Sequence, residues 1–149
     1  MDAFKLMEKD HKEVKAMMKK MEKIEDPQNR EKLFREIRIE LDAHAHMEEK
    51  SFYPRMKHSP ETKDITLESY EEHHVVKLLL NELDDLPKYR DEWLAKFIVL
   101  KENVEHHIKE EEEDFFPKAK KILGKKSEEL GEEMEKAKQQ YLNALRIIS

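Results

Sequence analysis

The sequence predicts an all-α protein: an up-down-up-down antiparallel four-helix bundle with an additional C-terminal helix. Charged residues make up 43% of the chain and glycines number only 2, which favours long solvated helices with few tight turns. Apolar residues recur at alternating spacings of three and four, the period of one helix face. Alternating β-branched runs between glycine-rich turns, which would indicate strands, are missing.

The first two predicted helices are separated by Asp26-Pro27, with Asp26 as N-cap and Pro27 in the first helical position. The first apolar stripe consists of Phe4, Met7, His11, Val14, Met18 and Met21. The second consists of Phe34, Ile37, Leu41, His44, Glu48 and Phe52. Pro54 is expected to bend or end this helix, and Ser59-Pro60 to begin the next one.

The third and fourth helices repeat this arrangement. The third stripe consists of Ser69, His73, Val76, Leu80 and Leu83, and Leu86-Pro87 ends it. The fourth begins at Trp93 or Phe97 and continues through Leu100, Val104, His107, Glu111 and Phe115. Pro117 is expected to bend its end, and Gly124 to stop it.

The remaining tail predicts a fifth, amphipathic helix that packs on the bundle or on a partner chain. It starts at Ser127, and its apolar residues lie at helix spacing: Leu130, Met134, Ala137, Tyr141, Leu145 and Ile148. We therefore expect a bundle over residues 1–123 and an additional helix over residues 124–149.

The bundle is predicted to consist of two copies of a helical hairpin, over roughly residues 2–57 and 64–123. Short links between long helices make neighbouring helices antiparallel. The copies share one motif, His-x-x-x-Glu-Glu-x-x-Phe-aromatic-Pro, which ends at Pro54 in the first copy and at Pro117 in the second. Residues four apart lie on the same helix face. Each copy therefore presents an imidazole beside a carboxylate, which is half of a metal site.

Neighbouring histidines leave two ligand choices to be decided. In the third helix, His73 shares its face with Val76, Leu80 and Leu83, whereas His74 shares its face with polar residues. In the fourth helix, His107 shares its face with Val104, Leu100 and Phe97, which lie three, seven and ten positions before it. His106 lacks such an apolar face. Alignment of the two copies also matches His73 with His11 and His107 with His44. We therefore expect His73 and His107 to face inward.

The predicted metal ligands are His11, His44, Glu48, His73, His107 and Glu111. Four imidazoles and two carboxylates are too many for one zinc ion but fit two metals that share bridging carboxylates. The mixed nitrogen and oxygen donors favour iron, with manganese second. A single histidine on an apolar stripe is usually only a core residue, and we interpret His46, His58, His74 and His106 as non-ligands. Glu49 and Glu112 are expected beside the ligands or on the surface.

Composition excludes several classes of function. The net charge is -6 and no basic stripe occurs, so nucleic acid is not an expected partner. Cysteine is absent, which excludes disulfides, thiolate metal sites and iron–sulfur clusters on this chain. No long apolar run occurs, and the N-terminus is charged and helical rather than a signal peptide. A cytoplasmic protein without a membrane partner is expected.

The repeated histidine and glutamate motif resembles the hemerythrin-like, or HHE cation-binding, domains over about residues 2–123. The resemblance implies two non-haem iron ions, bridged by two carboxylates and an oxo or hydroxo group. Such proteins bind dioxygen, sense oxygen or nitric oxide, or handle iron. His11, His44, Glu48, His73, His107 and Glu111 match the family's ligands one by one.

One departure from the oxygen-carrying members is a missing fifth histidine on the third helix. Ser69 and Lys77 lie one turn from His73 instead. Both irons would then keep an open position, and the expected function is binding of dioxygen or nitric oxide in sensing or stress protection. The alternatives are an iron-handling or iron–sulfur-repair-type di-iron protein, and a di-iron peroxidase or oxidase. No base, nucleophile or substrate cleft can be identified, so a non-enzymatic role is favoured. A monomer or homodimer is expected.

Overall fold

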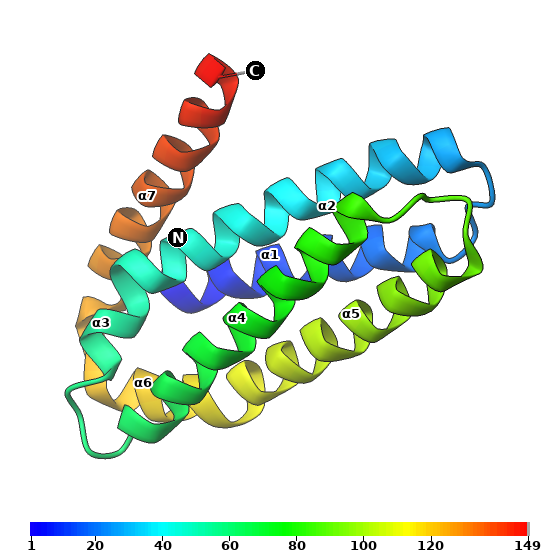
Figure 1. The fold of residues 1–149 in the computed structure, drawn as a ribbon. Coiled ribbons are helices and arrows are strands. Elements are labelled where there is room, and N and C mark those ends of the chain that lie inside the picture. The colour runs from blue at the N-terminus through cyan, green and yellow to red at the C-terminus, as the bar shows by residue number, and fades with distance from the viewer. Residues whose placement is uncertain (149) are drawn as a thin grey trace.

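The computed structural model describes residues 1–148, with side chains through Arg146, and this part consists of helices and connecting turns without any strand. Its four long helices are α1 (Ala3–Met21), α2 (Pro27–Met47), α4 (Lys63–Asp85) and α5 (Asp91–Glu110). They run alternately up and down, and the α1–α2 and α4–α5 links lie at the same end of the bundle (Figure 1). The predicted four-helix bundle is confirmed.

The helix boundaries follow the predicted signals with one exception. The Asn29 amide donates to the Asp26 carboxylate at 3.0 Å, so Asp26 caps α2 as expected. The predicted start of the third long helix at Ser59-Pro60 is wrong, because α4 begins at Lys63. The intervening residues form a turn instead, in which the Lys63 amide donates to the Ser59 carbonyl at 2.9 Å.

A π-helical turn precedes each of the two motif prolines: η1 (Glu48–Phe52) and η2 (Glu111–Phe115). The chain then continues as the short helices α3 (Tyr53–Met56) and α6 (Phe116–Leu123). A proline lacks the amide that would continue the i→i−4 ladder. The wider turn instead lets the Tyr53 amide donate to the Glu48 carbonyl, and the Phe116 amide to that of Glu111. The prolines therefore widen the helix rather than end it at once.

The apolar interior is divided into two clusters. The loop-end cluster lies near the α1–α2 and α4–α5 links and includes Met18, Phe34, Ile37, Trp93 and Phe97. The tail-end cluster lies at the opposite end and includes Phe4, Phe52, Tyr53, Phe115, Phe116, Leu130 and Met134. Buried polar side chains of α1, α2, α5 and the two π-helical turns separate these clusters, because they occupy the middle of the same helix faces.

The tail forms helix α7 (Ser127–Ile148), which follows Gly124 and the 3₁₀ turn η3 (Gly124–Lys126). Gly124 has φ 53°, the conformation expected of a glycine that ends a helix. Helix α7 packs on α1, α2 and η1, and its last turns extend away from the bundle (Figure 1). The side chain of Ile148 lies outside the described residues. The division of the chain at residue 123 stays a prediction.

None of the described helices combines the length with the apolar character that is needed to cross a bilayer.

Replacement of Gly131 by alanine should destabilise the docking of α7. A Cβ atom there would lie 2.2 Å from the Met1 carbonyl oxygen and 2.8 Å from the Ala3 amide nitrogen. Alanine normally stabilises a helix relative to glycine, but overpacking of this kind costs about 1–3 kcal/mol. Urea unfolding of Gly131→Ala should show the loss, whereas the exposed neighbour Glu132→Ala should not. Greater stability of Gly131→Ala would contradict this packing.

Candidate metal centre

The structure brings all six predicted ligands together in the polar layer between the two apolar clusters. Donor atoms of His11, His44, Glu48 and Glu111 all lie within 4.8 Å of one another. Donor atoms of Glu48, His73 and His107 form a second such group. We call His11 and His44 the α1–α2 half-site. His73 and His107 form the α4–α5 half-site.

Each carboxylate lies between the two half-sites. Oε1 of Glu48 is 3.3 Å from His44 Nε2 and 3.2 Å from His73 Nε2. The two oxygens of Glu111 diverge, with Oε1 at 3.1 Å from His11 Nε2 and Oε2 at 3.5 Å from His107 Nε2. Both glutamates are almost completely buried. Each glutamate therefore contacts a histidine of both half-sites.

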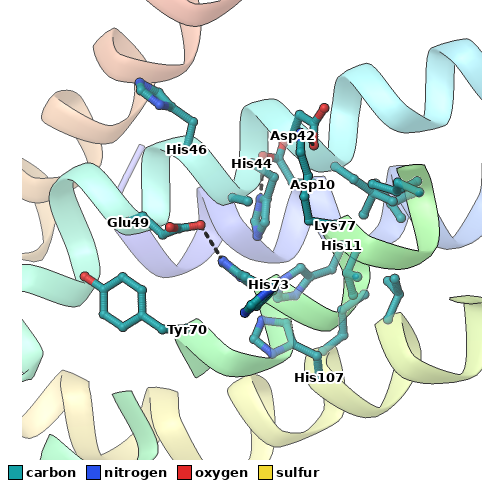
Figure 2. A pocket seen from close by; sticks show the side chains of 18 of the residues that line it. Asp10, His11, Asp42, His44, His46, Glu49, Tyr70, His73, Lys77 and His107 are labelled. Carbon is teal, nitrogen blue, oxygen red and sulfur yellow. Dashed lines mark hydrogen bonds and ion pairs between the residues drawn. The ribbon is translucent and has the colours of Figure 1, made fainter. Parts of the chain in front are cut away.

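Every histidine of the centre is held from behind by a further carboxylate. His44 Nδ1 donates to Asp10 at 2.9 Å, and His107 Nδ1 donates to Glu72 at 2.6 Å. His11 Nδ1 donates to Glu112 at 2.7 Å, and His73 Nδ1 donates to Glu49 at 2.9 Å. Figure 2 shows the bonds to Asp10 and Glu49. A bond of this kind fixes the tautomer and leaves Nε2 free to bind a metal.

Two of these supporting carboxylates, Asp10 and Glu72, are absent from the sequence prediction. The signal was present, because an acidic residue comes directly before the helix-borne histidine in both repeats: Asp10 before His11, and Glu72 before His73. Each holds the histidine of the partner helix in its own hairpin. Glu49 and Glu112 follow the two buried glutamates, and each holds a histidine of the other hairpin. The expectation that these two lie beside the ligands is consistent with this geometry.

The carboxylates of the centre raise the pKa of His44 and of His107. Burial lowers the pKa of His44, but the charges of Glu48 and Asp10 outweigh it and raise the pKa to about 10. Burial also opposes a charge on His107, yet Glu111 and Glu72 raise its pKa well above the ordinary value. The pKa of Glu111 is well below its ordinary value despite burial, because His107 and His11 stabilise the carboxylate. A bound cation would replace imidazole protons as the counter-charge.

Two buried polar atoms of the centre have no hydrogen-bond partner among the described residues: His44 Nε2 and Glu48 Oε2. His44 Nε2 is close to Glu48 Oε1, but the two groups are not aligned for a hydrogen bond. A buried polar atom without a partner costs several kcal/mol, on the order of 2–7. A metal ion between these atoms would supply the missing interaction, so the residues present fit a metal.

Tyr53 is a further residue of the centre that the sequence prediction did not include. Its buried hydroxyl donates to Glu111 Oε2 at 2.9 Å and lies 3.2 Å from His73 Nε2. In an α-helix, the residue on the face of Glu48 one turn later would be Phe52. The π-helical turn pairs residues five apart and brings Tyr53 to this face instead. The available signal was the proline that follows Tyr53.

The equivalent position in the second repeat is Phe116, which has no hydroxyl. Its ring stacks on His11 at a centroid distance of 6.0 Å and an interplanar angle of 8°. The two half-sites therefore differ: the α4–α5 half-site has an oxygen donor from Tyr53, and the α1–α2 half-site has an apolar ring.

A cavity of about 750 Å³ leads from the centre to the surface between α2 and α4 (Figure 2). His11, His44, His73 and His107 lie at its inner end. Part of its wall is apolar and comprises Val14, Leu41, Val76, Leu80, Val104 and Ile108. Charged side chains, among them Asp42, Glu49, Lys50 and Lys77, also line it. A cavity of this size is large enough to hold a small molecule next to the centre.

The remaining histidines lie outside the six-residue cluster. His58, His74 and His106 are exposed. His46 is half-buried at the edge of the cavity, and its ring packs on Tyr141 of α7 at 5.0 Å between centroids. Lys77 and Ser69, which occupy the place of a fifth histidine, have other partners: Lys77 pairs with Asp42 at 3.2 Å, and Ser69 donates to the Ile65 carbonyl at 2.8 Å.

The chain is similar to known proteins in fold and in sequence. A solved structure of a hemerythrin HHE cation-binding domain-containing protein from Mycobacterium kansasii superposes with a TM-score of 0.85 and 27% identity, over 97% of this chain and 89% of that one. A curated protein of Nostoc sp., named DNA nickase, is 30% identical over 107 residues. The match covers 72% of this chain but only 30% of that protein.

The family model described as "Hemerythrin HHE cation binding domain" matches residues 2–119. This range includes all six predicted ligands, Tyr53 and the four supporting carboxylates. The chain belongs to the hemerythrin HHE cation-binding domain family.

Proposed function

We propose that the centre holds two iron ions and binds dioxygen or nitric oxide, in sensing or in protection against stress. The observation that supports this most is the buried set of four Nε2 atoms around two carboxylates, with every Nδ1 held by a further carboxylate. Imidazole and carboxylate together suit iron, with manganese second. Two adjacent cations are the usual occupants of a site with two shared carboxylates.

The ligands divide between the two half-sites. His11 and His44 would hold one ion, and His73, His107 and the Tyr53 oxygen the other. Glu48 and Glu111 would be shared. Iron in such a site supplies reversible binding or reduction of a small ligand. The sequence led us to expect two open metal positions, but the Tyr53 oxygen would supply a further ligand on one side. We therefore place the open position at the α1–α2 half-site.

The cavity gives this proposal a route for the small ligand. It reaches the surface between α2 and α4, where polar contacts connect the two helices. Lys77 pairs with Asp42, and Arg38 pairs with Asp84 at 3.2 Å. Ion pairs that are partly exposed contribute about 0–1 kcal/mol each, so they can separate at little cost. The apolar side chains that line the cavity behind them, such as Val76, Leu80 and Val104, favour passage of dioxygen or nitric oxide.

An iron-handling role is the second candidate. A protein that donates iron needs ligands that release it, whereas all four imidazoles here are fixed by carboxylates. This rigidity favours a permanent metal centre, and slow iron loss to a chelator would separate the two roles. Turnover of peroxide would instead support an enzyme. Nicking of DNA is not proposed, because the Nostoc protein is matched over only 30% of its length and this chain has a net charge of -6.

Protein expressed with ample iron should contain roughly two irons per chain, as expected for a centre with shared carboxylates. Elemental analysis of the purified protein measures this directly. One iron per chain, or zinc at full occupancy, would contradict the di-iron proposal.

Removal of iron should lower the melting temperature, because an ion that binds only the folded state stabilises it by about 2.7 kcal/mol at a free concentration 100 times Kd. His44→Ala should lose both the iron and the stabilisation. His74→Ala should lose neither, because its side chain is exposed. If His74→Ala lost iron while His73→Ala kept it, the register of α4 would be wrong.

Tyr53→Phe should keep both irons but lose the visible absorption that a phenolate gives when it is bound to ferric iron. The matched control is Tyr70→Phe. The Tyr70 ring packs on that of Tyr53 at a centroid distance of 5.1 Å, and Tyr70 lines the cavity rather than contacting the predicted ligands. The measurement is an absorbance spectrum of the oxidised, iron-loaded proteins. Identical spectra for Tyr53→Phe and the unsubstituted protein would mean that both metal positions are open.

A further inference from the structure

We infer that α7 is part of the metal centre, and that Lys138 of this helix is a positioning residue for the ligand His44. The inference rests on the proposed function, since it assigns a role toward the metal of the α1–α2 half-site. The family match ends at residue 119, so it assigns nothing to α7.

A continuous chain of contacts connects α7 to the centre. Lys138 Nζ donates to Asp10 Oδ1 at 2.9 Å and lies 3.4 Å from Glu40 Oε2. The other oxygen of Asp10 accepts from His44 Nδ1 at 2.9 Å. His44 Nε2 then faces the centre and is one of the buried atoms that have no hydrogen-bond partner among the described residues. The ammonium group of Lys138 is therefore two contacts away from the ring of His44.

The support of His44 by Asp10 differs from the support of the other three histidines of the centre. Glu49, Glu72 and Glu112 have side-chain exposures of 42%, 27% and 35%, so water screens their charges. The side chain of Asp10 is only 3% exposed. Among the described residues, Asp10 is also the one of these four carboxylates that pairs with a lysine. A buried carboxylate needs such a partner, because an unpaired buried charge is costly.

The pseudo-repeat shows why only one half-site has this support. Asp10 and Glu72 occupy equivalent positions, directly before the histidines of α1 and α4. Helix α7 packs on the first hairpin, on α1 and α2. Lys138 thus reaches Asp10, and no lysine of the described residues pairs with Glu72 in the same way. The half-site that it supports is the one without the Tyr53 oxygen, which we propose as the open position.

The consequence concerns the orientation of the His44 ring. Lys138 holds one oxygen of Asp10, which leaves the other oxygen directed at His44 Nδ1. The bond to Nδ1 in turn directs His44 Nε2 toward the centre. Without the lysine, the buried carboxylate of Asp10 would lose its partner and would not be held in this orientation. Loss of Lys138 should therefore weaken metal binding at this half-site.

The test uses the full chain in its metal-free form, titrated calorimetrically with Zn²⁺ as a diamagnetic probe and loaded separately with iron for Mössbauer spectra. Lys138→Met should weaken one of the two Zn²⁺ sites about 10- to 100-fold, the usual effect of a supporting residue. It should alter the Mössbauer signal of one iron. The double variant K138M/D10N should recover most of the affinity, because an amide oxygen still accepts from His44 without a charge.

Arg55→Met is the matched control, because Arg55 pairs with Glu133 of α7 at 2.9 Å but does not contact the centre. It should leave both sites unchanged. Equal loss in Arg55→Met and Lys138→Met would reduce the role of Lys138 to docking of α7, and unchanged binding in a folded Lys138→Met would also overturn the inference. If Lys138→Met does not fold, the double variant decides: wild-type affinity supports the inference, and a weakened site overturns it.

The stoichiometry of the unsubstituted protein tests the proposed function separately. Fewer than two sites there would refute the two-metal proposal. The ratio of affinities between Lys138→Met and the unsubstituted protein would still test Lys138.

Discussion

The structure depends on two buried carboxylates, Glu48 and Glu111, in the middle of an apolar bundle. Each is stable there because imidazoles from both hairpins surround it. A buried charge without partners would cost a large part of the free energy of folding. The four histidines in turn need acceptors for their Nδ1 atoms, which come from Asp10, Glu49, Glu72 and Glu112. The polar layer is therefore one interdependent network that fixes how the four helices align.

The network is nearly symmetric because the chain repeats a helical hairpin, and its departures from symmetry are where the two half-sites gain different chemistry. Tyr53 and Phe116 are equivalent in the repeat, yet only Tyr53 brings an oxygen to the centre. Lys138 approaches only the first hairpin. The Tyr53 oxygen thus lies at the α4–α5 half-site, and the α7 contact lies behind the α1–α2 half-site.

The π-helical turns show how a local backbone constraint reaches the site. Pro54 and Pro117 lack amides, and the helix widens before each of them. The widening changes which residue follows each buried glutamate on the inward face. Without it Tyr53 would not lie on the face of Glu48, and its hydroxyl would not reach Glu111.

The sequence by itself determined the bundle, the hairpin repeat and the inward set of four histidines and two glutamates. These depend on helix periodicity, which relates residues three and four apart through local geometry. Only the tertiary structure determined three contacts: that of Tyr53 with Glu111, that of Asp10 with His44, and that of Lys138 with Asp10. The first depends on a turn that departs from α-helical periodicity. The other two join residues 34 and 128 positions apart, and such contacts are set by how the helices pack rather than by any local pattern.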